Sequence, residues 1–393
     1  MADPRTRHVA LLIETSNAYA RGLLTGVRRY VEARTGWSMY LGEHSRHETD
    51  FSWLDGWRGD GVLARIENAA TADLVRRLDL PTVDLSAARL IPALPGVETN
   101  DDMIARWAVE HFEQRGLRNF AFCGDERFAW ALKRASWFAE HVRRHGLVAH
   151  EYQMMPSGRR AVDRARLAEW ISQLPKPVGV LACYDIAGQE VLEACTIAGL
   201  RVPDEVAVVG VDNDDLIGTL TSPPLSSIEP DAVRTGHLAA RILDEMMDGR
   251  SVEPGLRLID PTRIVTRQSS DILAVDDPLV VRALRYIRGH ADQNLKVEAV
   301  LREVGISRRA LDHRFERLLG RSVHAEILRV RMGRVAELLS STDWTLQRIA
   351  DRLAFSHSEY MSVAFKKHTG KSPGAYRRSV HGSTDWHQEI DSP

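Results

Sequence analysis

Cysteine, long apolar runs and catalytic signatures are scarce or missing in this sequence of 393 residues. Its three cysteines, Cys123, Cys183 and Cys195, stand far apart along the chain. That spacing fits neither a disulfide framework nor a Cys-x-x-Cys metal site, so we expect buried free thiols and no bound metal. No apolar run approaches the ~18 residues of a membrane-spanning helix. The run Val9–Ile13 is too short for the core of a signal peptide, and we expect a cytoplasmic protein without membrane contact.

The sequence also lacks the motifs by which many enzymes are identified. It has no Gly-x-Ser-x-Gly elbow, no phosphate-binding Gly-x-x-x-x-Gly-Lys-Ser/Thr loop and no His-Glu-x-x-His zinc motif. No Gly-x-Gly-x-x-Gly follows the first apolar run, so dinucleotide binding is unsupported. We therefore expect no catalytic residues, no cofactor and no enzymatic activity. Two other classes of protein remain as alternatives: an α/β sugar-processing enzyme, and a transport binding protein, which would need an export signal.

Charge is spread unevenly, although the net charge is only −2. Residues 276–378 carry 20 Lys and Arg against 12 Asp and Glu, a net charge of +8. The preceding residues 1–275 carry a net charge of −7, and the last 15 residues carry −3. A basic part joined to a larger acidic part indicates that only the basic part meets a polyanion.

Short apolar runs alternate with amphipathic stretches through the first 265 residues. Continuous apolar runs are typical of parallel strands covered on both faces, and the alternation predicts an α/β fold with right-handed crossovers. The length of this region favours two lobes over one sheet. The predicted strands are Val9–Glu14, Ser38–Gly42, Gly61–Ala64, Thr82–Leu85, Asn119–Gly124, Val178–Cys183 and Val206–Val211.

The chain divides into four segments. Residues 1–268 form the predicted α/β domain, and the polar stretch 269–278, which ends in proline, forms a linker. After it no strand pattern remains, so residues 279–378 are predicted to be all α-helical. The last segment, 379–393, is acidic and without pattern, and we expect it to be disordered.

The helical segment contains two candidate helix-turn-helix units, the first over residues 295–320. Gly305 supplies the turn, because a positive φ costs glycine little. Ser307 is a suitable N-cap for the second helix, whose apolar stripe faces a core. Its opposite face mixes bases with hydrogen-bonding groups, as a helix in the DNA major groove requires. The residues of that face are Arg308, Arg309, Asp312 and His313.

The second unit covers residues 345–378. Its second helix is expected to begin at Ser356 and to point Ser358, Glu359 and Ser362 outward. Glu359 has two interpretations: it contacts a base, or it closes a capping box with Ser356. The two recognition segments begin 49 residues apart and are joined by a long helix over roughly 323–340. A rigid helix of that kind can place both segments in successive major grooves.

Residues 278–378 resemble the DNA-binding domain of the AraC/XylS family of regulators. The segments that carry the likeness are GISRRALDHRF, RVRMGRVAELLSSTDWTLQRIADRLAF and FKKHTGKSPGAYRR. The chain departs from the family's usual Gly, Phe and Arg at Ala354, Met361 and Val363, and Val363 cannot hydrogen-bond a base. The resemblance implies binding to a double-stranded DNA operator, with contacts from Arg308, Arg309, Asp312, His313, His357, Ser358, Glu359 and Ser362.

Residues 8–268 resemble the sugar-binding domain of LacI/GalR regulators, which has the two-lobed periplasmic-binding-protein fold. The likeness rests on RVPDEVAVVGVDNDDLIGTLTSPPLSSIEPD at 201–231, RIVTRQSSD at 263–271 and GVLACYD at 179–185. The family's N-terminal DNA-binding headpiece is missing here, and the helical segment supplies that function instead. The resemblance implies a sugar effector.

Polar residues just after the predicted strands are candidate effector ligands, since open α/β sheets bind ligands at the carboxyl ends of their strands. The resemblance to LacI/GalR regulators adds Arg134, which matches an arginine of that family at the start of a helix. Carboxylates and guanidinium groups can grip pairs of hydroxyls. We rank Asp212 first, then Asp185 and Arg134, then Asn17 and Tyr19. Asp212 has a turn or helix cap as its alternative role, and Asn17 and Tyr19 have a loop or N-cap role. The aromatic pair Phe128 and Trp130 can stack on a sugar or pack in a core.

A sugar sensor followed by paired helix-turn-helix units resembles the regulators of pentose-utilisation operons nearly from end to end. This likeness implies a homodimeric activator that responds to a pentose, D-xylose first, and contacts RNA polymerase. A different sugar, or action as a repressor, stays open, as does the choice between direct and inverted half-sites. We expect the sugar to close the two lobes and to favour the DNA-binding state of the dimer.

Overall fold

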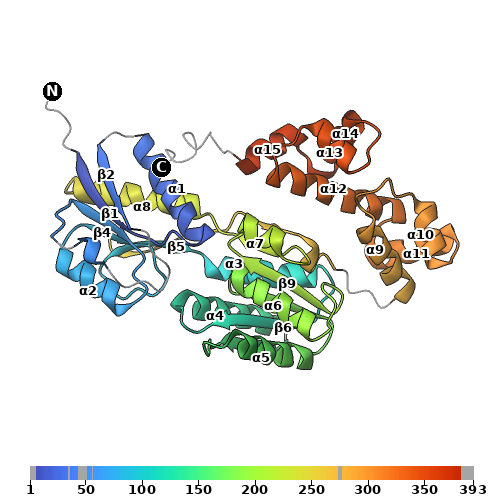
Figure 1. The fold of residues 1–393 in the computed structure, drawn as a ribbon, viewed down its shortest axis with the longest axis horizontal. Coiled ribbons are helices and arrows are strands. Elements are labelled where there is room, and N and C mark those ends of the chain that lie inside the picture. Colours follow the sequence, from blue (N-terminus) through green and yellow to red (C-terminus); the bar gives the residue numbers. More distant parts are fainter. Residues whose placement is uncertain (1–5, 34–35, 43–50, 55, 273–276, 382–393) are drawn as a thin grey trace. The chain divides into compact units, whose positions relative to one another are not determined.

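The computed structural model describes residues 6–33, 36–42, 51–54, 56–272 and 277–381. The chain forms two compact units, Met1–Ala274 and Val275–Pro393. The first, the α/β unit, contains all the strands of the described chain, and the second, the helical unit, contains helices alone (Figure 1). The predicted fold class, a two-lobed α/β domain followed by an all-α domain, is confirmed.

Lobe 1 of the α/β unit is built on a six-stranded sheet with the order β11-β5-β4-β3-β1-β2. All neighbouring strands in it run parallel. The strands are β1 (Arg7–Leu12), β2 (Trp37–Leu41), β3 (Gly61–Ala64), β4 (Thr82–Asp84), β5 (Pro95–Thr99) and β11 (Gly255–Ile259). Its helices are α1 (Ala18–Glu32), α2 (Ala69–Leu78) and α8 (Ala232–Met247), with a short 3-10 turn at Ser52–Leu54.

Lobe 2 is built on a second six-stranded sheet with the order β12-β10-β9-β8-β6-β7. It is parallel except for the antiparallel pair β10–β12. The strands are β6 (Asn119–Asp125), β7 (Ala149–Met154), β8 (Val178–Ala182), β9 (Val206–Val211), β10 (Ser226–Glu229) and β12 (Arg263–Val265). Its helices are α3 (Asp101–Glu113), α4 (Ala129–Arg144), α5 (Arg160–Gln173), α6 (Asp185–Ile197) and α7 (Asp215–Leu220), followed after β12 by a 3-10 turn at Gln268–Ser270.

The chain passes between the lobes three times, after β5, after β10 and after β11. Neighbouring crossover segments are hydrogen-bonded to one another: the Asn100 amide donates to the Ile259 carbonyl at 2.8 Å, and the Thr262 amide donates to the Glu229 carbonyl at 2.8 Å. Asn100 is also the N-cap of α3, where its side chain accepts from the Met103 amide. The three segments therefore form one bundle that holds the carboxyl ends of both sheets together.

The central strands are fully buried because helices cover both faces of each sheet. Every residue of β3, β8 and β9 is buried, as their continuous apolar runs predict. All seven predicted strands are present, within two residues at either end. Cys123, Cys183 and Cys195 are buried and free, as expected.

The α/β unit extends further than the sequence predicts. Ser269, inside the expected linker 269–278, is fully buried; its hydroxyl donates to the Val208 carbonyl at 2.7 Å and accepts from the Ser226 amide at 2.8 Å. The linker prediction is wrong for this part, because these polar side chains bond to the sheet instead of facing solvent. Residues 273–276 lie outside the described residues.

The helical unit has the two helix-turn-helix units that the sequence predicts, one at each end of α12 (Figure 1). The first end contains α9 (Pro278–Gly289), α10 (Val297–Val304) and α11 (Arg308–Leu319), and the second contains α13 (Leu346–Arg352), α14 (Ser358–Thr369) and α15 (Pro373–His381). The helix α12 (Val323–Ser341) is about 28 Å long at 1.5 Å per residue. Residues 379–381 belong to α15, so the expected tail starts later, and residues 382–393 lie outside the described chain.

Local sequence signals set the ends of these helices. Ser307 caps α11 by accepting from the Ala310 amide at 3.3 Å, and Gly305 ends α10 with φ of 79°. Both roles agree with the sequence. The second end of the unit packs on a core of Met332, Val335, Leu339, Ile349, Ala350, Leu353, Phe355, Met361, Ala364 and Phe365.

Candidate effector site and DNA-binding surface

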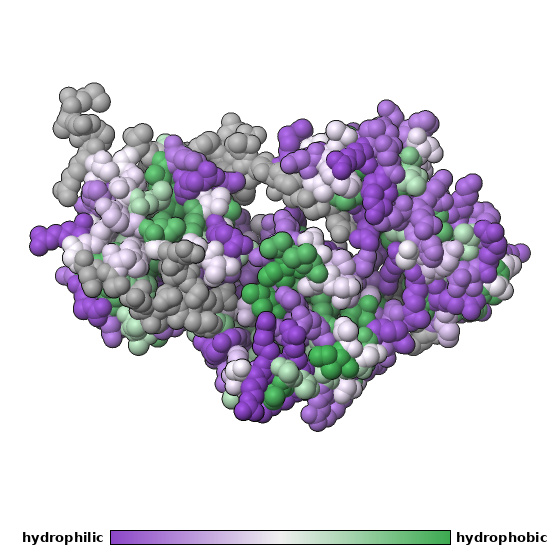
Figure 2. Space-filling view, viewed as in Figure 1, coloured by the Kyte–Doolittle hydropathy of each residue, from purple (hydrophilic) through white to green (hydrophobic). Residues whose placement is uncertain are grey.

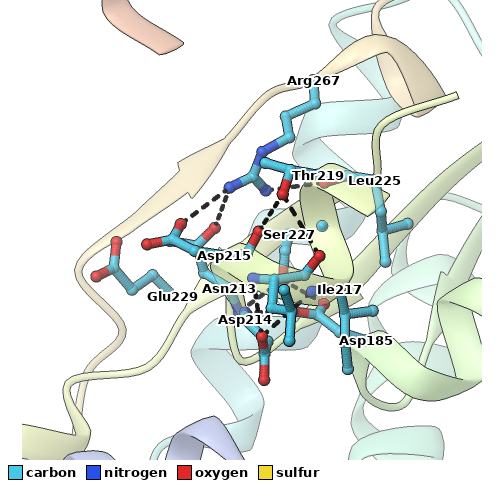
Figure 3. Close-up of polar contacts among 12 residues, drawn as sticks. Asp185, Asn213, Asp214, Asp215, Ile217, Thr219, Leu225, Ser227, Glu229 and Arg267 are labelled. Atoms are coloured by element: carbon cyan, nitrogen blue, oxygen red, sulfur yellow. Dashed lines mark hydrogen bonds and ion pairs between the residues drawn. The ribbon is translucent and has the colours of Figure 1, made fainter. Parts of the chain in front are cut away.

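Asp185 lies at the carboxyl end of β8, as the first residue of α6. It is 1% exposed, and its carboxylate accepts hydrogen bonds from the Ser227 hydroxyl at 2.6 Å and the Asp214 amide at 2.7 Å (Figure 3). Burial and the nearby charge of Asp212 raise the pKa of Asp185 well above its usual range. A carboxyl group held in this way can both accept from and donate to a hydroxyl of a ligand.

Gly210 makes room for the Asp185 carboxylate. A Cβ atom at Gly210 would lie 2.2 Å from Asp185 Oδ1, so only glycine allows β9 to approach this closely. The next turn is also special, because Asp212 and Asn213 have φ of 110° and 49°. Non-glycine residues with positive φ are uncommon and mark a constrained turn. The turn brings Asp212 close enough for its charge to act on both Asp185 and Arg134.

Arg134, on α4, is buried next to the crossover bundle. Its Nε donates to Asp101 Oδ1 at 2.8 Å, and Nη1 donates to the Cys183 carbonyl. Burial alone would lower the pKa of Arg134, but the Asp101 carboxylate outweighs it and raises that pKa. The guanidinium also lies over the Trp130 ring, with Cζ at 5.2 Å from its centroid. Arg134 is therefore held in a buried ion pair with Asp101, and the charge of Asp212 also acts on it.

The aromatic residues Phe128 and Trp130 pack in the core of lobe 2. They are 5% and 7% exposed, and their rings stack at 5.2 Å between centroids. Trp130 also contacts the edge of Tyr184 at 5.7 Å. Of the two interpretations that the sequence left open, core packing describes both rings.

Asn17 and Tyr19 follow the first strand, as expected, and each side chain already forms hydrogen bonds within the protein. Asn17 is the N-cap of α1: its side chain accepts from the Ala20 amide at 2.9 Å and donates to Glu14 at 3.1 Å. The Tyr19 hydroxyl donates to Glu98 Oε1 at 3.0 Å and accepts from the Thr99 hydroxyl at 3.0 Å. The N-cap alternative for Asn17 is confirmed, and effector contact by either residue stays a prediction.

A second group of charges at the carboxyl edge of the lobe 1 sheet was missed by the sequence analysis. Arg65 directly follows β3, and its guanidinium pairs with Glu14, which follows β1, and with Glu67 at 3.0 Å. Its Nε donates to the Leu85 carbonyl at 3.4 Å. We call Glu14, Tyr19, Arg65, Glu67 and Glu98 the lobe 1 cluster. The strand-end rule that identified Asp185 would also have identified Glu14 and Arg65.

Glu98, near the carboxyl end of β5, is the most unusual member of the lobe 1 cluster. It is 6% exposed, and burial raises its pKa to about 8 despite the opposing charge of Arg65. Its Oε1 accepts from the Tyr19 hydroxyl and from the Thr99 amide at 3.0 Å. Its Oε2 is buried and has no hydrogen-bond partner among the described residues.

A separate pocket of about 270 Å³ opens between β7, α5 and α6. Tyr152, Met154, Tyr184 and Arg127 are among the residues that line it, whereas Asp185, Asp212 and Arg134 are not. Arg127 is engaged by a bidentate pair with Asp125, at 2.8 and 2.5 Å.

The first recognition helix, α11, exposes the residues that the sequence assigns to DNA. Arg308, Arg309 and His313 are exposed, and Figure 2 shows hydrophilic residues over most of the visible face of the helical unit. Arg308 lies 3.6 Å from Asp312. Asp312 is more constrained than expected, because its Oδ1 accepts from the Val323 amide at 3.1 Å and so holds the start of α12.

The second recognition helix, α14, starts later than predicted. His357 is its N-cap without a side-chain hydrogen bond, so the capping box between Ser356 and Glu359, one of the two interpretations of Glu359, is not formed. The reason is that the helix begins at Ser358, two residues beyond the expected start, and Glu359 then sits exposed in the first turn. The Ser362 hydroxyl donates to the Ser358 carbonyl at 2.8 Å. Val363 is 69% exposed.

Comparison with known protein families matches both units. Residues 8–101 match the model described as "XylR N-terminal domain", and residues 109–270 match the periplasmic binding protein-like domain. Residues 300–379 match a helix-turn-helix domain. These matches agree with the likeness to LacI/GalR and AraC/XylS regulators in the sequence.

Two curated relatives match almost the whole chain. The xylose operon regulatory protein of Escherichia coli strain K12 is 30% identical over 383 residues, which cover 94% of this chain and 97% of the relative. The chain belongs to the xylose operon regulatory protein family. The member from Haemophilus influenzae is 27% identical over 379 residues, with the same coverage.

A solved structure supports membership of the xylose operon regulatory protein family at the level of the fold. The structure of the xylose-binding transcription activator xylR has a TM-score of 0.73 and 28% identity, covering 95% of this chain and 98% of that one. The chain is therefore a transcription regulator with a periplasmic-binding-protein-like domain and a helix-turn-helix DNA-binding domain. Within the described ranges, none of the helices combines the length and apolar character that crossing a bilayer requires.

Proposed function

We propose that this regulator binds D-xylose in its α/β unit and then activates transcription from a double-stranded DNA operator. The observation that carries the proposal is the combination of polar groups at the carboxyl ends of both parallel sheets with two exposed recognition helices in one chain. The relatives named for xylose favour D-xylose as the first sugar to test. Asp212, Asp185 and Arg134 would bind the sugar, with Tyr19 and Asn17 close to it.

The proposed response is a shift between two states of a cytoplasmic homodimer. Two contacts already join the lobes outside the crossover bundle: Lys133 Nζ donates to the Ala87 carbonyl at 2.8 Å, and Arg21 lies 3.5 Å from Asp214. Sugar bound between the strand ends would favour the closed arrangement, by no more than its difference in affinity for the two states. Each protomer would then present α11 and α14 to one half-site, and the bound dimer would contact RNA polymerase.

The DNA contacts of the proposal divide into two kinds. Base reading would come from Arg308, Arg309 and His313 on α11, with Asp312 in a partly structural role. His357, Ser358, Glu359 and Ser362 would serve at α14. Bidentate and charged groups on such helices read base edges in the major groove, while other bases position the protein on phosphates.

The test is calorimetric titration of the full chain with D-xylose and a panel of pentoses and hexoses. Asp212→Asn keeps the side-chain shape and tolerates the left-handed backbone, so lost binding would report on the carboxylate. The matched control is Asp73→Ala, an exposed residue of α2 that pairs with Arg76 at 2.8 Å. Binding of another sugar would retain the regulator and change the effector. Absence of binding by any sugar would refute the sensor.

A second experiment separates activator, repressor and enzyme. Retention on random and genomic DNA is measured against salt concentration with and without sugar, and the sugar is recovered and analysed afterwards. The proposal predicts sugar-dependent, salt-sensitive retention and unchanged sugar. A reporter gene that rises with sugar supports an activator, and one that is released from inhibition by sugar supports the repressor alternative. Chemical conversion of the sugar would favour an enzyme.

A further inference from the structure

The lobe 1 cluster contains a buried carboxyl oxygen that the protein itself leaves without a hydrogen bond. Glu98 Oε1 already accepts from the Tyr19 hydroxyl and the Thr99 amide, whereas Oε2 has no partner among the described residues. Buried acceptors in folded proteins are nearly always paired, so an unpaired one calls for a ligand, water or ion. Glu98 Oε2 can therefore accept one more hydrogen bond.

The neighbouring donors are already engaged elsewhere. Among the described residues, Arg65 is a cation whose charge acts on Glu98, and its guanidinium donates to Glu14, Glu67 and the Leu85 carbonyl. A donor for Glu98 Oε2 must then come from outside this cluster. Because Asn100 starts the crossover to lobe 2 two residues later, and Asp101 pairs there with Arg134, Glu98 lies beside the proposed effector site.

The charge of the cluster restricts what can bind there. Three glutamates surround one arginine, so the cluster has an excess of negative charge when all are ionised. A carboxylate brought into this dry environment by a ligand would meet like charges, which is strongly unfavourable. A sugar hydroxyl carries a hydrogen to donate and no charge.

We propose, resting on the function proposed above, that Glu98 is an effector-binding residue: Oε2 accepts a hydroxyl hydrogen of the sugar, and the cluster excludes sugar acids. The titratable groups that act on it are Tyr19 from α1, Arg65 and Glu67 after β3, and Asp101 of α3. A ligand that donates to the carboxylate favours its ionised form. Binding of a neutral sugar near pH 7 then releases a proton from Glu98.

The first test compares D-xylose with its oxidised acid, D-xylonate, by calorimetry of the full chain at pH 8.5. The same comparison is made for any other sugar that binds, with its own aldonate. The wild type binds the neutral sugar at least about 100-fold more tightly than the acid. Glu98→Met, which keeps the length and removes the acceptor, weakens sugar binding about 10- to 100-fold. The control is Glu169→Met, an exposed residue of α5, and it leaves affinity unchanged.

A second measurement uses the wild type alone, so that a folding defect of the variant does not matter. The heat of binding near pH 7 is measured in buffers with different ionisation enthalpies, which gives the number of protons released. Proton release supports the proposal, and none overturns it. Equal binding of sugar and acid, or unchanged affinity in a folded Glu98→Met variant, overturns it while leaving the sugar sensor in place. Failure of every neutral sugar to bind the wild type overturns both proposals.

Discussion

The candidate effector residues of the α/β unit and the candidate DNA-binding residues of the helical unit use charged side chains in opposite ways. In the α/β unit, Arg134 and Glu98 are less than a tenth exposed and are fixed by hydrogen bonds. In the helical unit, Arg309 and Glu359 are exposed. The same residue types therefore work in two environments, one dry and one hydrated.

This difference suits the first environment to specific recognition of a small effector and the second to salt-sensitive binding of DNA. Charges away from water interact strongly and tolerate little misplacement, which suits recognition of one small molecule. Exposed charges are hydrated and screened by salt, which suits a long polyanion reached by release of counterions. We expect changes in the first unit to alter stability and effector choice, and changes in the second to alter DNA affinity and its salt dependence.

The largest effect should follow removal of Arg134. Arg134→Ala leaves the Asp101 carboxylate buried without its partner, and we expect a loss of about 3–5 kcal/mol in the free energy of unfolding. Chemical denaturation measures it. Arg309→Ala, the exposed counterpart, should stay within about 0.5 kcal/mol of the wild type. Similar losses in the free energy of unfolding of the two variants would contradict this difference between the units.

A double variant sharpens the same point. Arg134→Met combined with Asp101→Leu replaces the ion pair with apolar side chains, and much of the lost stability should return. Sugar binding should not return with it. Recovery of sugar affinity would show that the pair serves the fold alone.

The next effect concerns the pH dependence of stability. Burial raises the pKa of Glu98 to about 8 from its usual 4.5, so the folded state holds a proton that the unfolded state releases between these values. Glu98 makes its full contribution to the free energy of unfolding below about pH 4.5. That contribution is lost as the pH rises toward 8, with a slope up to about 1.4 kcal/mol per pH unit. Glu98→Gln removes that slope. Urea denaturation at pH 5.5, 6.5 and 7.5 measures it, with Glu359→Gln as the exposed control.

An intermediate effect is expected on DNA. Arg309→Ala should weaken operator binding by about 1–3 kcal/mol if the side chain reads a base, or lower the salt slope by about one counterion if it contacts a phosphate. Fluorescence anisotropy at several salt concentrations distinguishes the two outcomes. Sugar affinity should be unchanged; a parallel loss of sugar binding would contradict the division between the units.

The smallest effect is a gain. Val363 is 69% exposed on α14 and offers neither charge nor hydrogen bond to DNA. Val363→Arg should tighten operator binding by less than about 1 kcal/mol and raise the salt slope by about one counterion. The same anisotropy series measures it, and Lys367→Ala should move the slope in the opposite direction. An unchanged slope in Val363→Arg would mean that this face of α14 points away from DNA.

Much of the fold could be predicted from the sequence, because several strands, such as β3, β8 and β9, are continuous apolar runs. Five strands were missed for physical reasons. The sequence of β10, SSIE, is mostly polar, since Ser226 and Ser227 bond within the protein. The short β12 lies at a sheet edge, as does β11, while β7 is polar and also at an edge. β5 contains Pro95 and Gly96 and gives no apolar run.

The missed strand β5 also explains the missed site residue. Because β5 was not predicted, Glu98 could not be recognised as a residue near a strand end. Its hydrogen bond with Tyr19 also joins segments about 80 residues apart in the chain. Asp185 and Asp212 were found because each follows a clear apolar strand. The partners of Asp185, the Ser227 hydroxyl and the Asp214 amide, could not be predicted, since a sequence does not state which donor will reach a carboxylate.

The crossover bundle has a consequence for how the chain is made. Lobe 1 is discontinuous: its sheet takes β11, and its helix layer takes α8, from residues that follow most of lobe 2. A ribosome must therefore finish residue 259 before the sheet of lobe 1 can be completed, and α1 can pack against α8 only after most of lobe 2 has been made. The helical unit is continuous in sequence and takes no helix from another part of the described chain. The helix-turn-helix units are thus made after both lobes of the α/β unit have all their described strands.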